Sequence, residues 1–119
     1  MSSPTETAAR TYIQAWGEPD ADARARLIEA CFATDGRIVA PGSVIHGRAA
    51  LRSSIDDFLA RGLSAHLASA IDVQGALFRF HAIAKDREGR VIFDGFDTAE
   101  VDADGRIAVL LAFGGAPLA

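Results

Sequence analysis

The sequence of 119 residues contains no asparagine, a single lysine and a single cysteine. Because Cys31 has no second cysteine to pair with, an internal disulfide is excluded. The missing asparagine removes every N-glycosylation site. Residues 1–4 have neither the basic start nor the apolar run of a secretory signal, so we expect a reducing, cytoplasmic location.

Long apolar runs and clusters of positive charge are also missing. The longest apolar stretch, residues 107–113, is far shorter than the ~20 residues that span a membrane. The net charge is −4 and the arginines are dispersed along the chain. Nucleic acid and anionic membranes require a basic stripe, so the sequence predicts neither of them as a partner.

Signatures of cofactor and metal sites are absent as well. The chain has no glycine-rich phosphate-binding motif and no histidine pair at metal-ligand spacing. Residues 102–105 (Asp-Ala-Asp-Gly) resemble the start of a calcium loop, but the later ligands and the closing glutamate are missing. A hairpin turn explains this segment, and we predict that the protein has neither a cofactor nor a metal.

Half of the residues are apolar, which is enough to form a hydrophobic core. At this length the sequence predicts one domain over residues 1–119. Ser3, Pro4 and Glu6 match the N-cap, first-turn proline and capping-box acid of a helix that ends near residue 17. A second helix follows residue 20, with residues 27, 28, 31 and 32 at helical spacing and Arg24 and Arg26 predicted to be solvated. A third helix is expected over residues 47–62.

Between and after the helices the pattern favours strands. Short strands are expected at residues 37–40 and 44–46, ahead of the third helix. Four long antiparallel strands are expected at residues 65–73, 77–85, 90–101 and 106–113, with glycine-containing turns between the later ones. The order is ααββα followed by four long strands, and helices on one face of such a sheet make an α+β domain.

One carboxyl group interrupts an apolar strand face. On residues 90–101, alternate side chains form an apolar face that contains Asp97. If Lys85 pairs with Arg90, the apolar face of the preceding strand joins this one. This register places Phe78 opposite Asp97 and Phe80 opposite Gly95. Desolvation raises the pKa of such a carboxyl toward neutral pH, where it can transfer a proton. A structural alternative is a carboxylate capped by a backbone amide or paired with an arginine.

Several segments, in this order and spacing, resemble the NTF2-like superfamily in its SnoaL-like and ketosteroid-isomerase-like branch. They are residues 12–16, residues 31–35, Pro41 with Ile45-His46-Gly47-Arg48, and Gly95-Phe96-Asp97 followed by residues 104–107. The resemblance implies an NTF2-like cone, in which three helices pack on a strongly curved antiparallel (mixed) sheet around a pocket. The fold hosts many activities and does not by itself define one.

The resemblance also implies roles for particular residues. Ketosteroid isomerases use a tyrosine on the first helix and a protonated aspartic acid late in the sheet as an oxyanion hole. By position, Tyr12 and Asp97 correspond to these two catalytic groups. The family's aspartate base corresponds to Ala40, so steroid isomerisation by the family's mechanism is not expected. Epoxide hydrolysis of the limonene type is not expected either, because it needs an asparagine and an Asp-Arg-Asp group.

We expect an apolar pocket that binds a small molecule. His46 is either a substitute for the missing base or a turn residue that satisfies a backbone carbonyl, and the second reading is favoured. Helix-face aromatic residues serve both as core and as ligand wall in such a pocket. The residues expected to line it are Trp16, His46, Phe32, Phe58, Phe78, Phe80 and Phe93.

Two functions remain open at this stage. The first is a cofactor-free isomerase or cyclase that acts on an apolar carbonyl compound, with Asp97 as acid/base or hydrogen-bond donor and Tyr12 as a second donor. The second is a non-catalytic ligand- or partner-binding module of the same fold, which Ala40 favours. Since both faces of residues 107–113 are apolar, we also expect a homodimer through the outer face of the sheet.

Overall fold

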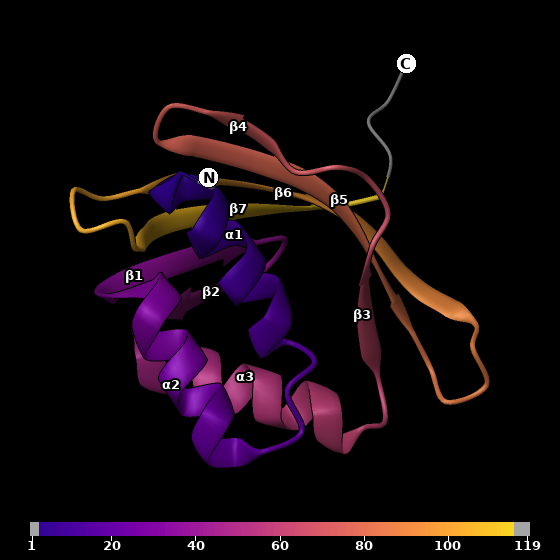
Figure 1. The fold of residues 1–119 in the computed structure, drawn as a ribbon. Helices are drawn as coiled ribbons and strands as arrows, with labels where there is room; N and C mark the ends of the chain where they lie inside the picture. Colours follow the sequence, from indigo (N-terminus) through magenta and orange to yellow (C-terminus); the bar gives the residue numbers. More distant parts are fainter. Residues whose placement is uncertain (1–2, 116–119) are drawn as a thin grey trace.

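The computed structural model describes residues 3–115 of the chain. Its three helices lie together on one side of a curved sheet (Figure 1). The elements follow in the order α1 (Pro4–Ala15), α2 (Ala21–Cys31), β1 (Phe32–Ala40), β2 (Ser43–His46), α3 (Arg48–Ala60), β3 (Ser64–Leu67), β4 (Asp72–Gln74), β5 (Leu77–Lys85), β6 (Val91–Val101) and β7 (Ile107–Gly114). The predicted α+β arrangement is confirmed.

The strands form one mixed sheet in the order β2-β1-β7-β6-β5-β3, with β4 also paired to β5. The β1–β7 pair is parallel and the other pairs are antiparallel. The two ends of this order, β2 and β3, are joined through α3, so the helix crosses the open side of the curve (Figure 1). The result is a cone whose inner face meets the helices.

The helix ends form where the sequence signals them. The Ser3 hydroxyl caps α1 by accepting from the Glu6 amide at 3.1 Å, and the Asp20 carboxylate caps α2 by accepting from the Ala23 amide at 2.8 Å. After α3, Gly62 adopts φ +77°, and the Leu63 amide donates to the Phe58 carbonyl at 3.3 Å. None of the helices in the described part of the chain is long and apolar enough to cross a membrane.

Two boundaries differ from the prediction. Phe32 was expected to continue the second helix but is the first residue of β1, which is longer than the predicted strand 37–40. The strand predicted over residues 65–73 is two short strands, β3 and β4, because the chain leaves the sheet between them. There the Ser69 hydroxyl accepts from the His81 amide at 2.8 Å, so a side chain replaces part of the backbone ladder.

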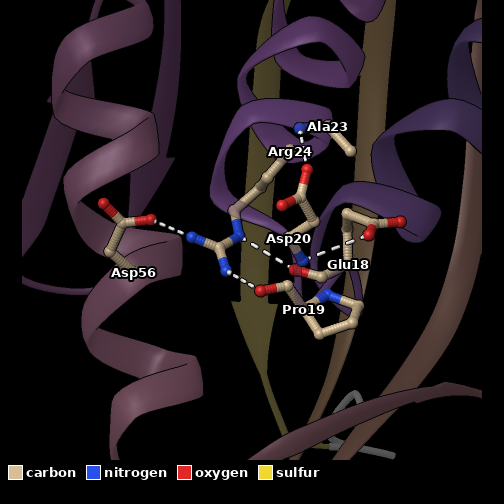
Figure 2. A network of polar contacts seen from close by, with 6 residues as sticks. All are labelled: Glu18, Pro19, Asp20, Ala23, Arg24 and Asp56. Atoms are coloured by element: carbon tan, nitrogen blue, oxygen red, sulfur yellow. Dashed lines mark hydrogen bonds and ion pairs between the residues drawn. The ribbon is translucent and has the colours of Figure 1, made fainter.

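Arg24 is a third difference, since it was expected in solvent and is only 7% exposed. Figure 2 shows its guanidinium reaching from α2 toward α3, where it pairs with Asp56. Its Nε donates to the Glu18 carbonyl at 3.0 Å and its Nη2 lies 3.4 Å from the Pro19 carbonyl. A buried charge needs partners of this kind. Arg24 therefore joins the α1–α2 loop to α3, while Arg26 is exposed as predicted.

The β5–β6 register also differs, by two residues. Phe80, rather than Phe78, lies opposite Asp97, and Phe78 lies opposite Ala99. Lys85 pairs with Val91 instead of Arg90, and a bulge between Ala84 and Lys85 adds the second residue of the shift. A shift by two keeps every side chain on its predicted face, so Asp97 remains on the apolar side.

Strict alternation along residues 107–113 predicts that Ile107, Leu111 and Phe113 share one face, but a bulge in the β6–β7 pair separates them. Ile107 and Leu110 are both fully buried on the inner face, whereas Leu111 and Phe113 are exposed by 41% and 59%. The irregularity between Glu100 and Val101 changes the alternation at this point.

The core lies between the inner face of the sheet and the helices. Its largest fully buried side chains are Phe32, Phe78, Leu51, Ile55, Ile107, Leu110 and Cys31.

Candidate functional site

A cavity of about 280 Å³ opens between the inner face of the sheet and the helices α1 and α3. Its walls are almost entirely apolar. The lining residues are Tyr12, Ile13, Trp16, Ile38, Ala40, Ile45, Phe58, Ala65, His66, Leu67, Phe80, Ala82, Ala84, Phe93, Asp97 and Ala112. A cavity of this size suits a small organic ligand rather than a peptide or nucleic acid.

Asp97 is the carboxyl group of this cavity. It lies in the middle of β6, opposite Phe80 on one neighbouring strand and Ala112 on the other. Burial raises the pKa of Asp97 from 3.8 to about 6. No arginine or lysine is among the cavity-lining residues of the described chain, so burial acts without a cationic partner to offset it. Asp97 can therefore hold or release a proton close to neutral pH.

Tyr12 enters the cavity from α1 and is only 5% exposed. Burial raises the pKa of Tyr12 well above its usual value, and the nearby charge of Asp97 raises it further. The indole of Trp16 acts in the opposite direction and favours the phenolate. The net effect keeps Tyr12 a neutral phenol, which can donate a hydrogen bond but does not act as a base.

Trp16 forms the third polar side chain of the wall. Its ring meets Tyr12 edge to face, with centroids 6.3 Å apart at 70°, and meets Phe58 of α3 at 5.0 Å and 89°. These are the tilted arrangements that aromatic pairs prefer. Within residues 3–115, Nε1 of Trp16 is buried and has no hydrogen-bond partner.

Six of the predicted site residues line this cavity: Tyr12, Trp16, Phe58, Phe80, Phe93 and Asp97. Three others lie elsewhere. Phe32 and Phe78 are buried in the core, at 0% and 1% exposure, and do not line the cavity. His46 is exposed on β2, because the strand alternation that turns Ile45 into the cavity turns His46 away from it. Whether the six bind a ligand stays a prediction.

Ala40, the residue predicted to stand where ketosteroid isomerases carry a base, is part of the cavity wall. Ala40 lines the cavity from β1, so the space for a base exists but its side chain is a methyl group. His66 also borders the cavity, from β3. It pairs with Ile83, whereas its neighbours Ala65 and Leu67 pair with the inner-face residues Ala84 and Ala82.

The His66 side chain therefore points to the opposite face, where its Nε2 lies 2.8 Å from the Ser64 hydroxyl oxygen. It does not replace the base.

Several wall residues were not singled out from the sequence. Most are small or aliphatic: Ile13, Ile38, Ile45, Ala65, Leu67, Ala82, Ala84 and Ala112. Strand alternation could have identified Ala82 and Ala84 as wall residues, because they share the strand face of Phe80. Whether residues of β1, β2 and β3 reach the cavity wall depends on how strongly the sheet curves, and strand alternation does not predict that curvature.

A larger groove of about 790 Å³ lies on the outer face of the sheet. There His81 pairs with Asp94 and stacks on Phe96 with ring centroids 4.5 Å apart. Arg79 pairs with Asp72 at 2.7 Å. These side chains satisfy one another and are partly solvated. The carboxyl of the inner cavity has no cation among the described lining residues, so the inner cavity is the stronger candidate for chemistry.

The comparisons with known proteins agree with this architecture. A family model described as a SnoaL-like domain matches residues 9–110, and the chain belongs to this family. The three helices and the curved mixed sheet of this chain form an NTF2-like fold, consistent with the solved structures described next. No curated protein matches the sequence of this chain significantly.

Among the solved structures, a protein from Agrobacterium tumefaciens strain C58, provisionally named an isomerase of the SnoaL-like family, is 26% identical. The match covers 97% of this chain and 100% of that one, with a TM-score of 0.84. A protein from Sinorhizobium meliloti, provisionally named a polyketide cyclase, is 23% identical over 88% and 92% of the two chains, with a TM-score of 0.68.

The epoxide hydrolase/cyclase-like enzyme SalBIII, named for a role in pyran ring formation in the polyether salinomycin, is 18% identical. That match covers 94% of this chain and 90% of SalBIII, with a TM-score of 0.70. At these low identities the second and third structures support the fold alone.

Proposed function

We propose that this protein binds an apolar, carbonyl-containing small molecule in the inner cavity and moves a proton on it through Asp97, without a cofactor. The observation that carries the proposal is the carboxyl of Asp97, which lies in an apolar wall without an arginine or lysine among the described lining residues and has a pKa of about 6. A carboxyl of this kind is uncommon unless it is used, because its burial opposes ionisation without a compensating partner.

The reaction that fits is proton abstraction next to a carbonyl group. The Asp97 carboxylate takes the proton from the neighbouring carbon, and the electron pair of the C–H bond shifts to the carbonyl, giving an enolate. The Tyr12 hydroxyl donates a hydrogen bond to the enolate oxygen, where charge develops. Asp97 then returns the proton to another carbon, which completes an isomerisation.

The same groups serve a cyclisation. There the enolate carbon attacks a second carbonyl of the ligand, and the protonated Asp97 gives its proton to the alkoxide that forms. The Agrobacterium relative is provisionally named an isomerase, which supports a reaction of the first type. In both reactions Asp97 begins as a base and ends as an acid, so no second base is required.

The alternative is a binding module without catalysis, and Ala40 is the observation that favours it. A ketone with acidic α-protons, β-tetralone, separates the two functions. Binding is followed by the fluorescence of Trp16, the single tryptophan of the chain. Proton abstraction is followed by exchange of the α-protons for deuterium in NMR spectra recorded in D2O.

Catalysis predicts that Asp97→Asn still binds β-tetralone but exchanges its protons at least about a hundredfold more slowly than the wild type. The matched control is Asp94→Asn, three residues away on the opposite face of β6, which should exchange as the wild type does. Binding by the wild type without exchange above the rate in buffer would instead support the binding module.

A homodimer through the outer sheet face is part of the proposal. Exposed apolar side chains gather on this face, among them Ile92, Leu111 and Phe113 at 52%, 41% and 59% exposure. Covering such a patch removes apolar surface from water. Light scattering after size exclusion at micromolar concentration should give twice the chain mass, and Phe113→Asp should reduce it. A monomeric wild type would refute the dimer.

The proposed partners include neither nucleic acid nor membrane, and the proposed location is the cytoplasm.

A further inference from the structure

Phe93 lies where the inner cavity meets solvent. It lines the cavity from β6, yet the residue is 49% exposed. A side chain that has one side toward a cavity and the other toward water forms the boundary of that cavity. Asp97 lines the same cavity four residues further along β6, and strand alternation puts both side chains on one face.

Two glycines make room for the Phe93 ring on this face. Gly95 on β6 pairs with Gly114 on β7. A Cβ atom added to Gly95 would lie 2.7 Å from the Phe93 ring, and one added to Gly114 would lie 3.7 Å from it, so the ring covers this glycine pair. Gly95 stands between Phe93 and Asp97 on the inner face, so the ring leans along β6 toward the carboxyl group.

The neighbours of Phe93 on β5 are also small. Ala84 pairs with Phe93, Ala82 pairs with Gly95, and both alanines line the cavity. Replacing Phe93 by alanine would therefore leave methyl groups and glycines between the carboxyl of Asp97 and this edge of the cavity. The bulk that closes this end of the cavity on β5 and β6 is the Phe93 ring.

We propose that Phe93 determines the specificity of the inner cavity, by closing one end of it and limiting it to compact carbonyl compounds of about the size of two fused rings. The cavity volume of about 280 Å³ agrees with this limit, because larger ligands occupy pockets of roughly 300–1,000 Å³. The same ring keeps water away from Asp97. The inference rests on the proposed function, because it concerns the ligand of that same cavity.

The first test compares β-tetralone with its linear and its angular benzo-fused homologue, which add a third ring in two different directions. Binding is followed by the fluorescence of Trp16. The wild type should bind both homologues at least about tenfold more weakly than β-tetralone, because the Phe93 ring occupies the space that a third ring needs. Phe93→Ala should bind one of them at least about tenfold more tightly than the wild type does, because the third ring then replaces the phenyl ring.

Two further variants serve as controls. Val91→Ala truncates a similarly exposed apolar side chain, at 53%, which is not among the cavity-lining residues of the described chain, and it should keep the wild-type preference. Phe93→Leu keeps an apolar side chain that covers less of the glycine pair, so its gain should be smaller than that of Phe93→Ala. Equal binding of all three ketones by the wild type, no gain in Phe93→Ala, or the same gain in Val91→Ala would overturn the inference.

The second test needs no ligand. Burial raises the pKa of Asp97 to about 6, and a 13C NMR titration of its carboxyl carbon measures this value. Phe93→Ala should lower the pKa of Asp97 toward 3.8, because water then reaches the carboxyl, and Val91→Ala should leave it unchanged. An unchanged pKa in Phe93→Ala, or an equal fall in both variants, would overturn the inference. If the wild type binds none of the three ketones, the proposed function fails, and this titration still decides whether Phe93 closes the cavity.

Discussion

In the β5–β6 pair, Asp97 lies directly opposite Phe80, and both side chains face the cavity that Tyr12 enters from α1. The pair places a carboxyl group beside an aromatic ring and away from any cation among the cavity-lining residues of the described chain. This environment, rather than a hydrogen-bond network, determines how Asp97 titrates.

Stability should therefore fall as pH rises through the titration of Asp97. The folded pKa of about 6 lies above the value of 3.8 expected for an unfolded aspartate, so the folded protein binds the proton more tightly. The stabilising effect is complete below pH ~4 and is lost as the pH rises past ~6. About 1–2 kcal/mol is expected, after allowing for the solvent that still reaches the carboxyl.

Urea unfolding at several pH values measures this dependence. In Asp97→Asn the loss between the two pH values should disappear, because the amide does not titrate. A wild-type stability that instead increases with pH over this interval would mean that Asp97 is paired or solvated, and the acid/base proposal would lose its central residue.

The Arg24–Asp56 pair should respond unequally to removal of its two members. The Arg24 side chain is 8% exposed and that of Asp56 is 46% exposed. Asp56→Ala leaves a buried guanidinium short of a partner and should cost about 2–3 kcal/mol of unfolding free energy. Arg24→Met lets Asp56 return to water and should cost less, about 1–2 kcal/mol.

The exposed Arg61–Asp57 pair on the same helix is the control, with side chains 66% and 64% exposed. Arg61→Met should change the unfolding free energy by no more than about 0.5 kcal/mol. Denaturant titration of all three variants checks the order. An Arg24 variant that loses more than the Asp56 variant would show that the loop carbonyls, not the ion pair, dominate this contact.

Gly95 should tolerate no side chain. A Cβ atom there would lie 2.5 Å from the Phe113 carbonyl oxygen and 2.7 Å from the Phe93 ring. The backbone oxygen has no room to yield, so Gly95→Ala should cost about 1–3 kcal/mol and displace Phe93 from the cavity wall. Weaker β-tetralone binding would accompany the loss. Gly17→Ala is the control, since its nearest contact would be 3.9 Å away, and a similar loss in both variants would contradict the steric argument.

Ala40 offers a gain-of-function test. It lines the cavity at the position where relatives are expected to carry a base. Ala40→Asp should speed deuterium exchange of β-tetralone by at least about tenfold over the wild type, because a second carboxylate then faces the ligand. The matched change Val44→Asp, at a side chain that is 61% exposed, should have no effect. No gain in Ala40→Asp would mean that bound β-tetralone does not present its α-protons to β1.

Local features of this protein follow from the sequence alone. Ser3, Asp20 and Gly62 mark helix ends because each satisfies backbone groups within a few residues of itself. The placement of Asp97 on an apolar face follows from strand alternation, which survives a register shift of two residues. Family membership was also predictable, since its motifs are short and ordered along the chain.

The remaining features depend on contacts between distant segments. The partner of Arg24 lies 32 residues away on another helix, so no local pattern marks it as buried. Phe78 belongs to the core and Phe80 to the cavity because the curvature of the sheet separates two residues of one strand face. His46 and His66 are turned away by their pairing with β1 and β5. The sequence thus determined which residue types face inward, and the tertiary structure decided which of them share one cavity. The reason is that sheet curvature, bulges and helix docking each depend on many contacts between residues far apart in the sequence.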